Sequence, residues 1–160
     1  MTTIGVTGHQ VLPLEAVSYI EREIARIVEE IGSRGDLVGL TSLAIGADQL
    51  FAKAIIFAGG QLEVIVPCRE YETTFNREED LIAYRLLLAR SSKVEIMDYD
   101  NPSEESFFAA GCRIVDSCDE LLAIWDGKPA RGFGGTADIV KYARGDARRI
   151  TVIWPKGVVR

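Results

Sequence analysis

The hydrophobic residues fall into two alternating patterns along the chain. Short runs rich in apolar and β-branched residues occur at 3–7, 37–42, 62–66, 94–97, 121–125 and 150–154, and several are continuously apolar, as is typical of strands that are buried on both faces of a sheet. Between these runs, apolar residues recur at every third or fourth position, as they do on one face of a helix. Strands that alternate with helices predict an α/β fold, here a three-layer, Rossmann-like sandwich that is doubly wound around a mostly parallel central sheet.

Individual residues predict where the helices begin. Pro13 suits the first position of the first helix. Asn101 can cap the helix that follows it, and Thr136 is placed to cap the last helix. The chain shows no repeat, linker or low-complexity stretch, and we therefore predict one domain over residues 1–160.

Composition narrows the class of protein. At 160 residues, with 48% hydrophobic and 26% charged residues, the chain resembles an ordinary soluble globular domain. Its formal net charge of −6 argues against a surface for nucleic acid or for an anionic membrane. No apolar run approaches the roughly 20 residues that span a bilayer, and no basic stretch followed by an apolar one opens the chain. We therefore expect a cytoplasmic protein with no nucleic-acid partner and no membrane partner.

Several common chemistries lack their sequence motifs. The three cysteines, Cys68, Cys112 and Cys118, form no C-x-x-C pair, which argues against a disulfide framework and a zinc site. The chain also lacks a G-x-x-x-x-G-K-[ST] loop, a G-x-G-x-x-G after its first strand and a G-x-S-x-G turn. These absences argue against P-loop nucleotide hydrolysis, an ordinary NAD-dependent dehydrogenase and a Ser-His-Asp hydrolase. We predict no metal and no bound cofactor.

The most informative stretch is a glycine-rich loop between the apolar run at 121–125 and the last helix. Glycine backbones can approach a ligand closely, and the first N–H groups of a helix have no partner within the helix. Together with the helix dipole, such groups favour a phosphate, and Lys128 and Arg131 add positive charge. The alternative is a loop that needs its glycines only to turn. The predicted phosphate-binding residues are Gly132, Gly134, Gly135 and Thr136.

Other candidate site residues follow the predicted strands. In open α/β sheets, ligands bind outside the carboxyl ends of the strands, near a switch in strand order. The unusual residues of this chain gather at those ends, which predicts a small-molecule site there. They are Gly8 and His9 after the first strand, Ser42, Gly46, Ala47 and Asp48 after the second, Arg69 after the third and Asp126 after the fifth.

Each side chain in this group has a structural alternative. His9, the only histidine, is a proton donor, a ligand contact or a hydrogen-bonding residue of its loop. Asp48 holds a ribose hydroxyl or complements the N-terminus of its helix. Ser42 donates to a phosphate or simply ends a strand. Arg69 is a phosphate clamp if it points inward, and a solvated loop charge if it does not. Asp126 is expected to tie down the glycine-rich loop or to contact a ligand.

Three segments follow one another on alternating predicted strands and helices: V-T-G-H at 6–9, S-L-A-I-G-A-D at 42–48 and G-F-G-G-T-A-D at 132–138. In this order they resemble the SLOG superfamily of Rossmann-like proteins. That group includes the Lonely Guy phosphoribohydrolases, the DNA-processing protein A family and the sensor domain of TRPM channels. The middle segment is similar to the S-G-x-A-x-G-x-D stretch of the DNA-processing proteins, with Thr41-Ser42 in place of Ser-Gly.

The resemblance implies a site for a nucleotide or a nucleotide-derived ligand, with phosphate on the glycine-rich loop. The Lonely Guy enzymes carry P-G-G-x-G-T-x-x-E, in which the glutamate serves cleavage of the N-glycosidic bond. Matching that G-T to Gly135 and Thr136 puts Ile139 at the glutamate position, and Asp138 lies one residue earlier, about 100° around the helix. Isoleucine can neither stabilise nor attack an oxocarbenium-like centre. This departure weighs against that activity unless Asp138 or Asp48 has taken over.

Three functions are therefore compared below. The leading hypothesis is a module that binds a nucleotide-type small molecule as a sensor or signalling domain. The alternative is an N-glycosidase that acts on nucleoside 5'-monophosphates, with Asp138, Asp48 and His9 as catalytic candidates. The third is an interaction protein whose pocket is vestigial. Homodimerisation is common in such families and stays open.

Overall fold

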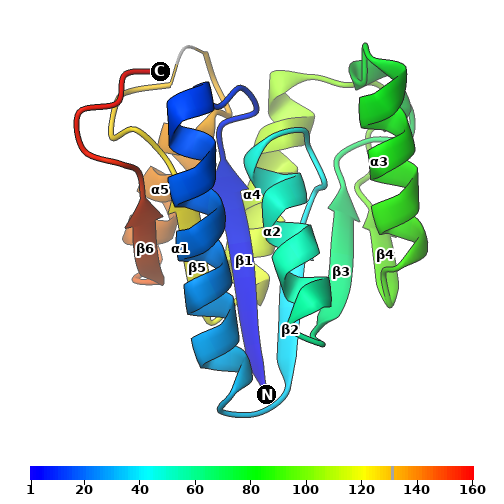
Figure 1. Ribbon diagram of the computed structural model, residues 1–160. Coiled ribbons are helices and arrows are strands. Elements are labelled where there is room, and N and C mark those ends of the chain that lie inside the picture. The colour runs from blue at the N-terminus through cyan, green and yellow to red at the C-terminus, as the bar shows by residue number, and fades with distance from the viewer. Residues whose placement is uncertain (131) are drawn as a thin grey trace.

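The structure is a six-stranded parallel sheet between two layers of helices (Figure 1). It is a computed structural model that describes residues 1–130 and 132–160. The strands are β1 (Thr2–Gly8), β2 (Leu37–Thr41), β3 (Gln61–Val66), β4 (Lys93–Ile96), β5 (Glu120–Ile124) and β6 (Arg149–Ile153). The helices are α1 (Leu14–Gly32), α2 (Ala47–Phe57), α3 (Glu78–Ala89), α4 (Glu104–Ser117) and α5 (Thr136–Gly145), with a short 3-10 helix, η1 (Tyr71–Thr74).

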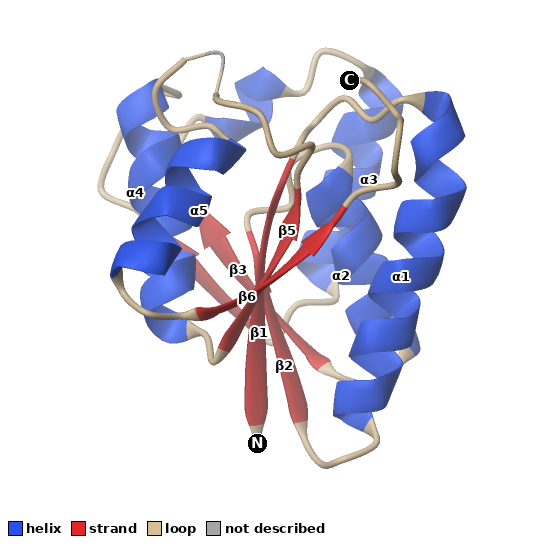
Figure 2. Cartoon of the chain, turned by 90° about the vertical axis from the view of Figure 1, so that its left-hand side faces the viewer, coloured by secondary structure: helices blue, strands red, loops and turns tan. Residues whose placement is uncertain are grey.

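The strand order confirms the predicted doubly wound fold. Neighbouring strands follow the order β4-β3-β2-β1-β5-β6, and all pairs are parallel. Helices α1, α2 and α3 cover one face of the sheet, and α4 and α5 cover the other (Figure 2). From β1 the chain builds outward to β4, and α4 then carries it back to add β5 on the other side of β1. The direction of building therefore reverses between β1 and β5, where the fold is expected to bind a ligand.

Two hydrophobic cores explain why the strands are continuously apolar. Val64 and Val66 of β3 belong to the core under α1, α2 and α3, whereas Ile65 between them belongs to the core under α4 and α5. Side chains alternate between the faces of a strand, so an inner strand of a sheet covered on both sides is buried at successive positions, as β2 is, whereas the edge strand β4 is mostly exposed. The larger core is packed by Ile20 of α1 and Phe51 of α2, both fully buried.

The helix starts differ from the predicted ones at three places. Pro13 is the residue before α1 rather than its first residue. The cap of α4 is Ser103, not Asn101: the Ser103 hydroxyl accepts from the backbone N–H of Ser106, whose own hydroxyl accepts from the N–H of Ser103, both at 3.0 Å. The capping box requires two side chains three residues apart, here Ser103 and Ser106. The helix therefore starts after Ser103, and Asn101 lies two residues before its cap.

The predicted cap of α5 is also corrected. Gly135 occupies the cap position, and Thr136 is already the first helical residue, with no side-chain cap bond. The carboxylate of Asp138 instead accepts from the backbone N–H of Gly134 at 2.8 Å. An acidic side chain in the first turn thus serves the backbone ahead of the helix, as the dipole favours.

None of the helices in the described part of the chain has the length and apolar character that crossing a membrane requires. The longest, α1, has 19 residues and carries charged side chains on its exposed face.

Candidate functional site

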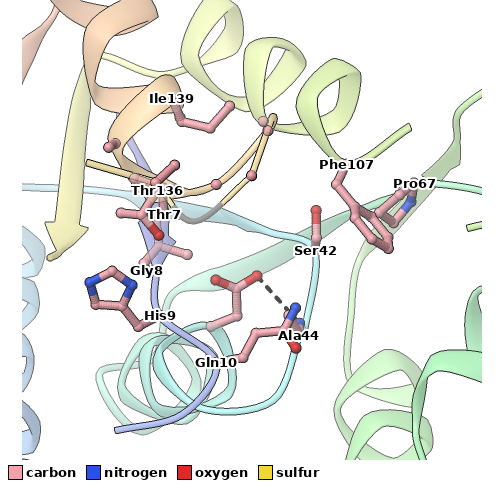
Figure 3. A pocket seen from close by; sticks show the side chains of 18 of the residues that line it. Thr7, Gly8, His9, Gln10, Ser42, Ala44, Pro67, Phe107, Thr136 and Ile139 are labelled. Carbon is pink, nitrogen blue, oxygen red and sulfur yellow. Dashed lines mark hydrogen bonds between the residues drawn. The ribbon is translucent and has the colours of Figure 1, made fainter. Parts of the chain in front are cut away.

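A cavity of about 330 Å³ lies at the carboxyl edge of the sheet, at the switch between β1 and β5 (Figure 3). One wall is the end of β1 with Thr7, Gly8 and His9. The opposite walls come from the loop after β2, from α4, and from the glycine-rich loop with the start of α5. The predicted site residues that line it are Gly8, His9, Ser42, Asp48, Gly132, Gly134, Gly135 and Thr136. Segments far apart in the sequence therefore converge where the sequence predicted a ligand.

Gly46 and Ala47 lie beneath the cavity and do not line it. Gly46 has a φ of +79°, and a Cβ there would lie 2.2 Å from the carbonyl oxygen of Gln10. The backbone N–H of Ala47, which is fully buried, donates to the carbonyl of His9 at 3.2 Å. These two residues hold the turn after β1 against the start of α2, because only a residue without a side chain lets the two backbones approach so closely.

Arg69 points away from the cavity. Its guanidinium donates to Asp98 at 2.7 Å and to Asp100 at 2.8 Å, and its side chain is half exposed. The interpretation of Arg69 as a phosphate clamp is therefore not supported, and the solvated loop charge is what the structure contains. The carboxylates that hold it follow β4, a strand whose loop carried no signal in the sequence.

The glycine-rich loop presents fewer phosphate donors than its sequence suggests. Gly134 has a φ of +87°, and a Cβ there would lie 2.7 Å from the carbonyl oxygen of Glu104, so its glycine is needed for the turn against α4. Its N–H is already bonded to Asp138. The N–H groups that open α5 include those of Thr136 and Ala137, two residues that also line the cavity, and such groups are suited to an anion. Lys128 adds a cation to the lining, whereas Arg131 lies outside the described residues.

Asp48 brings a buried carboxylate to the opposite side of the cavity. It is 7% exposed, and burial raises its pKa from 3.8 to about 6, although the N–H of Ala44, the hydroxyl of Thr41 and the N–H of Ser42 act in the opposite direction. Figure 3 shows the bond from the N–H of Ala44, which measures 3.3 Å. Asp48 sits in the first turn of α2, as the helix interpretation requires, and it also lines the cavity; that it holds a ribose hydroxyl stays a prediction.

His9 forms a buried cluster with Asp126 and Arg160. The imidazole Nε2 lies 3.3 Å from Asp126 Oδ1, and Arg160 Nη1 lies 2.7 Å from Nδ1. Trp154 contacts the ring edge-on, with ring centroids 5.5 Å apart. Burial disfavours the charged form of Asp126, but the N–H of Lys128, the His9 ring and the Arg160 guanidinium outweigh it and lower the pKa of that carboxyl.

Asp126 has the structural one of its two expected roles, and its contact with a ligand stays a prediction. It does not line the cavity, but its Oδ1 accepts from the N–H of Lys128 at 3.0 Å and so ties down the start of the glycine-rich loop. Asp138, the first catalytic candidate, also lies outside the lining, with its carboxylate used by Gly134. Of the three candidates, Asp48 and His9 reach the cavity and Asp138 does not.

Several residues that line the cavity were not predicted as site residues, among them Phe107, Ile114 and Arg160. Phe107 and Ile114 come from α4 and line the apolar side of the cavity, as does Tyr71 of η1. Burial raises the pKa of Tyr71 well above its ordinary value. On a helix, side chains that point into a core and side chains that line a pocket share one periodic pattern, so only topology separates them. Arg160 carried no sequence signal, because it follows the last strand without a motif around it.

Comparison with solved structures finds this fold in other proteins. DNA processing protein A from Streptococcus pneumoniae matches with a TM-score of 0.69 and 15% identity, over 99% of this chain and 52% of that one. DNA processing protein A from Helicobacter pylori matches with 0.67 and 14%, over 94% and 64%. The molybdenum cofactor binding protein from Rippkaea orientalis matches with 0.59 and 18%, over 94% and 75%. Neither a protein-family model nor a curated protein matches the sequence.

These comparisons bear on the fold. The chain spans 52% and 64% of the lengths of the two DNA processing proteins. At such low sequence identities the likeness shows the fold alone. DNA processing protein A is one of the proteins that the sequence motifs resemble, and the comparison shows that this chain shares its fold.

The expected absence of a nucleic-acid partner is wrong as an inference from charge. The Helicobacter pylori structure is described as showing a single-stranded DNA binding mode, and it has the fold of this chain. A net charge of −6 does not decide the matter, because nucleic acid is bound by local surface charge and by backbone contacts rather than by the sum over the chain. The fold is thus compatible with nucleic acid as well as with a small cofactor.

Proposed function

We propose that this chain binds a nucleotide-derived phosphorylated ligand in the cavity at the carboxyl edge of the sheet, as a sensor or signalling module. The observation that carries the proposal is the start of α5, whose Thr136 and Ala137 open the helix at the wall of the cavity. A helix N-terminus binds phosphate through its unpaired N–H groups and its dipole. The molybdenum cofactor binding protein from Rippkaea orientalis has the same fold, which supports a small molecule as the occupant.

The cavity is polarised in a way that suits such a ligand. The phosphate end is formed by the start of α5 and by Lys128. Asp48 and Ser42 line the cavity from the segments that follow β2, and their carboxylate and hydroxyl can form hydrogen bonds with ribose hydroxyls or with a base edge. Phe107 supplies an aromatic surface for a planar ring. One compact site thus presents partners for phosphate, sugar and base.

The residue at the position of the catalytic glutamate supports a binding function rather than N-glycoside cleavage. Ile139, which stands at the glutamate position of the Lonely Guy motif, lines the cavity and is 3% exposed. Its side chain packs so closely on α4 that a Cβ at Gly111 would lie 2.3 Å from Ile139 Cδ1. An apolar side chain therefore fills the place of the catalytic carboxylate.

A hydrolase stays the second candidate because of Asp48. Among the described residues that line the cavity, it is the one carboxylate, and a pKa of about 6 suits a general acid or base near neutral pH. A hydrolase releases free base from a bound nucleoside monophosphate, and Asp48→Asn abolishes that release while sparing binding. A binding module releases no base with either chain.

The test of the proposed function is a thermal-shift panel of mononucleotides, ADP-ribose, NAD, cyclic nucleotides and a short single-stranded oligonucleotide. A ligand at about a hundred times its Kd stabilises the fold by roughly 2.7 kcal/mol, which raises the Tm by several degrees. Stabilisation by at least one phosphorylated compound, with no response to its dephosphorylated nucleoside, is the expected result. No response to any compound contradicts the proposal and favours an interaction protein with a vestigial pocket.

The variant that locates the ligand is Gly135→Asp, with Gly135→Asn as its matched control. Gly135 is the cap of α5 and has an extended backbone, with a φ of −75° and a ψ of −179°, which any residue adopts. Asp and Asn are both favourable caps, so both variants are expected to fold. Only Asp adds a negative charge at the proposed phosphate position. We expect Gly135→Asp to lose the ligand response and Gly135→Asn to retain more of it.

A further inference from the structure

The segment after β6 returns to the edge of the sheet that holds the cavity. Both views place the end of the chain at the same edge as the loop after β5 (Figures 1 and 2). Trp154 fixes the return, because its indole N–H donates to the carbonyl of Val158 at 2.9 Å and both side chains pack against the larger core. Arg160 is thereby held in the lining of the cavity.

The contacts of the Arg160 guanidinium are few for a side chain that is only 20% exposed. Its Nη1 lies 2.7 Å from His9 Nδ1, and its Nε lies 3.5 Å from Asp126 Oδ2. Within the described part of the chain, that Nε is buried and makes no hydrogen bond. A guanidinium carries five N–H donors, and a buried donor without an acceptor is a costly arrangement that calls for an explanation.

Neutralising Asp126 does not account for this arrangement. Asp126 Oδ1 already accepts from the N–H of Lys128 at 3.0 Å and faces His9 Nε2 at 3.3 Å. An arginine stays protonated, so Arg160 Nη1 is the donor to His9 Nδ1, and the backbone N–H of Asp126 donates to His9 Nε2 at 3.2 Å. A single imidazole nitrogen can accept a hydrogen bond from only one N–H group of the guanidinium. A phosphate can accept two parallel hydrogen bonds from the planar guanidinium, in bidentate geometry.

The charges around the cavity point the same way. Among the described lining residues, the permanent cations are Lys128 and Arg160, and both lie on segments next to the carboxyl ends of β5 and β6. Asp48 comes from α2, which follows β2 on the far side of β1. One side of the cavity is therefore cationic, and the start of α5 adds its dipole to the same side.

We infer that Arg160 binds the anionic group of the ligand together with the N-terminus of α5, and that His9 and Asp126 are positioning residues that hold its guanidinium in place. The ligand class is a phosphate monoester or diphosphate. This inference rests on the proposed function and adds to it the side chain that binds the anionic group of the ligand. Because Trp154 and Val158 fix the segment in advance, Arg160 is ordered before the ligand arrives, which reduces the entropy lost on binding.

The test compares Arg160→Gln with Arg69→Gln, a matched loss of one guanidinium at the same edge of the sheet but outside the cavity. The probes are AMP and inorganic pyrophosphate, with adenosine as the uncharged control, titrated by calorimetry at low salt. Loss of a hydrogen bond to a charged group predicts that Arg160→Gln weakens AMP and pyrophosphate by about tenfold to a hundredfold. Adenosine affinity is expected to stay unchanged, and Arg69→Gln to bind all probes as the wild type does.

The outcomes separate this inference from the proposed function. If Arg160→Gln binds AMP like the wild type while Gly135→Asp does not, the inference is wrong and the proposed function stands. If the wild type binds neither AMP nor pyrophosphate, the inference falls with the phosphate site itself. If Arg160→Gln fails to fold, Arg160→Lys replaces it: the charge is kept but the fork is lost, and an AMP affinity equal to that of the wild type overturns the bidentate role.

Discussion

Replacing Asp48 by asparagine tests how the cavity carboxylate is held. Burial raises the pKa of Asp48 from 3.8 to about 6, so the folded protein binds this proton more tightly than the unfolded chain does. The contribution of Asp48 to stability is therefore fully present below about pH 4 and is lost as the pH rises through about 6. Asparagine carries no charge, and its variant should not show this loss.

The magnitude follows from the size of the pKa shift. A rise from 3.8 to about 6 spans about 2 pH units, and each unit corresponds to about 1.4 kcal/mol, which gives a cost of the order of 3 kcal/mol at neutral pH. The amide oxygen of asparagine can still accept from the N–H of Ala44, but its NH2 group meets donors from Thr41 or Ser42. That mismatch is present at every pH and cancels in a comparison between two pH values.

The assay is urea denaturation of wild type and Asp48→Asn at about pH 4 and about pH 7.5, with the exposed Asp36→Asn as a control for the change in charge. Relative to the wild type, Asp48→Asn should gain about 2 to 3 kcal/mol in unfolding free energy between the lower and the higher pH. Tyr71, whose pKa lies well above its ordinary value, does not titrate in this range. A difference between variant and wild type that is the same at both pH values refutes the reasoning.

Two further predictions concern the framework of the site. Gly46→Ala should lower the unfolding free energy by more than about 3 kcal/mol, because its Cβ would lie 2.2 Å from the carbonyl oxygen of Gln10. Gly59→Ala is the control, because Gly59 has a similar φ of +78° but a Cβ there would meet nothing within 4 Å, and it should lower the unfolding free energy by only about 1 kcal/mol. Equal losses in thermal or urea unfolding would contradict the close approach. Ser103→Ala should lose about 1 kcal/mol through the cap of α4, and Asn101→Ala little; the reverse ranking would restore Asn101 as the cap.

Most of the fold could be predicted from the sequence because each element carries its own periodicity. The apolar runs mark all six strands to within about two residues. Val64, Ile65 and Val66 show why, because adjacent side chains enter different cores and apolar residues are favoured at successive positions. Strand order is another matter. The position of β5 beside β1 depends on where α4 crosses the sheet, which no local pattern records.

The helix caps were less predictable because several residues compete for them. Asn101 and Ser103 are both good caps, and the choice between them is made by the hydroxyl of Ser106, three residues beyond Ser103. At α5, Thr136 is a good cap by type, but the backbone turn at Gly134 needs an acceptor that Asp138 supplies. Residue type therefore indicates several possible cap residues, and the backbone conformation of the loop before the helix determines which of them is the cap.

Residues that line the cavity were predicted as site residues where they follow strands directly, and several that do not follow strands were missed; that they bind a ligand stays a prediction. Gly8, His9 and Ser42 lie at strand ends, and the edge rule for parallel sheets places them together. Arg69 also follows a strand, yet Asp98 and Asp100 draw its side chain away. The direction of a side chain depends on partners from distant parts of the chain, and a single sequence does not show which distant residues will be its neighbours.

The central claim is that a phosphate group lies at the start of α5, and amide chemical shifts test it directly. In a titration of the 15N-labelled protein with AMP, the N–H groups of Thr136 and Ala137 should shift and saturate, because these are the helix donors that line the cavity. Gly59, at the far end of α2, should stay in place. If Thr136 and Ala137 do not move while AMP binds, or if the shifts gather elsewhere, the phosphate is held by another part of the molecule and the account is contradicted.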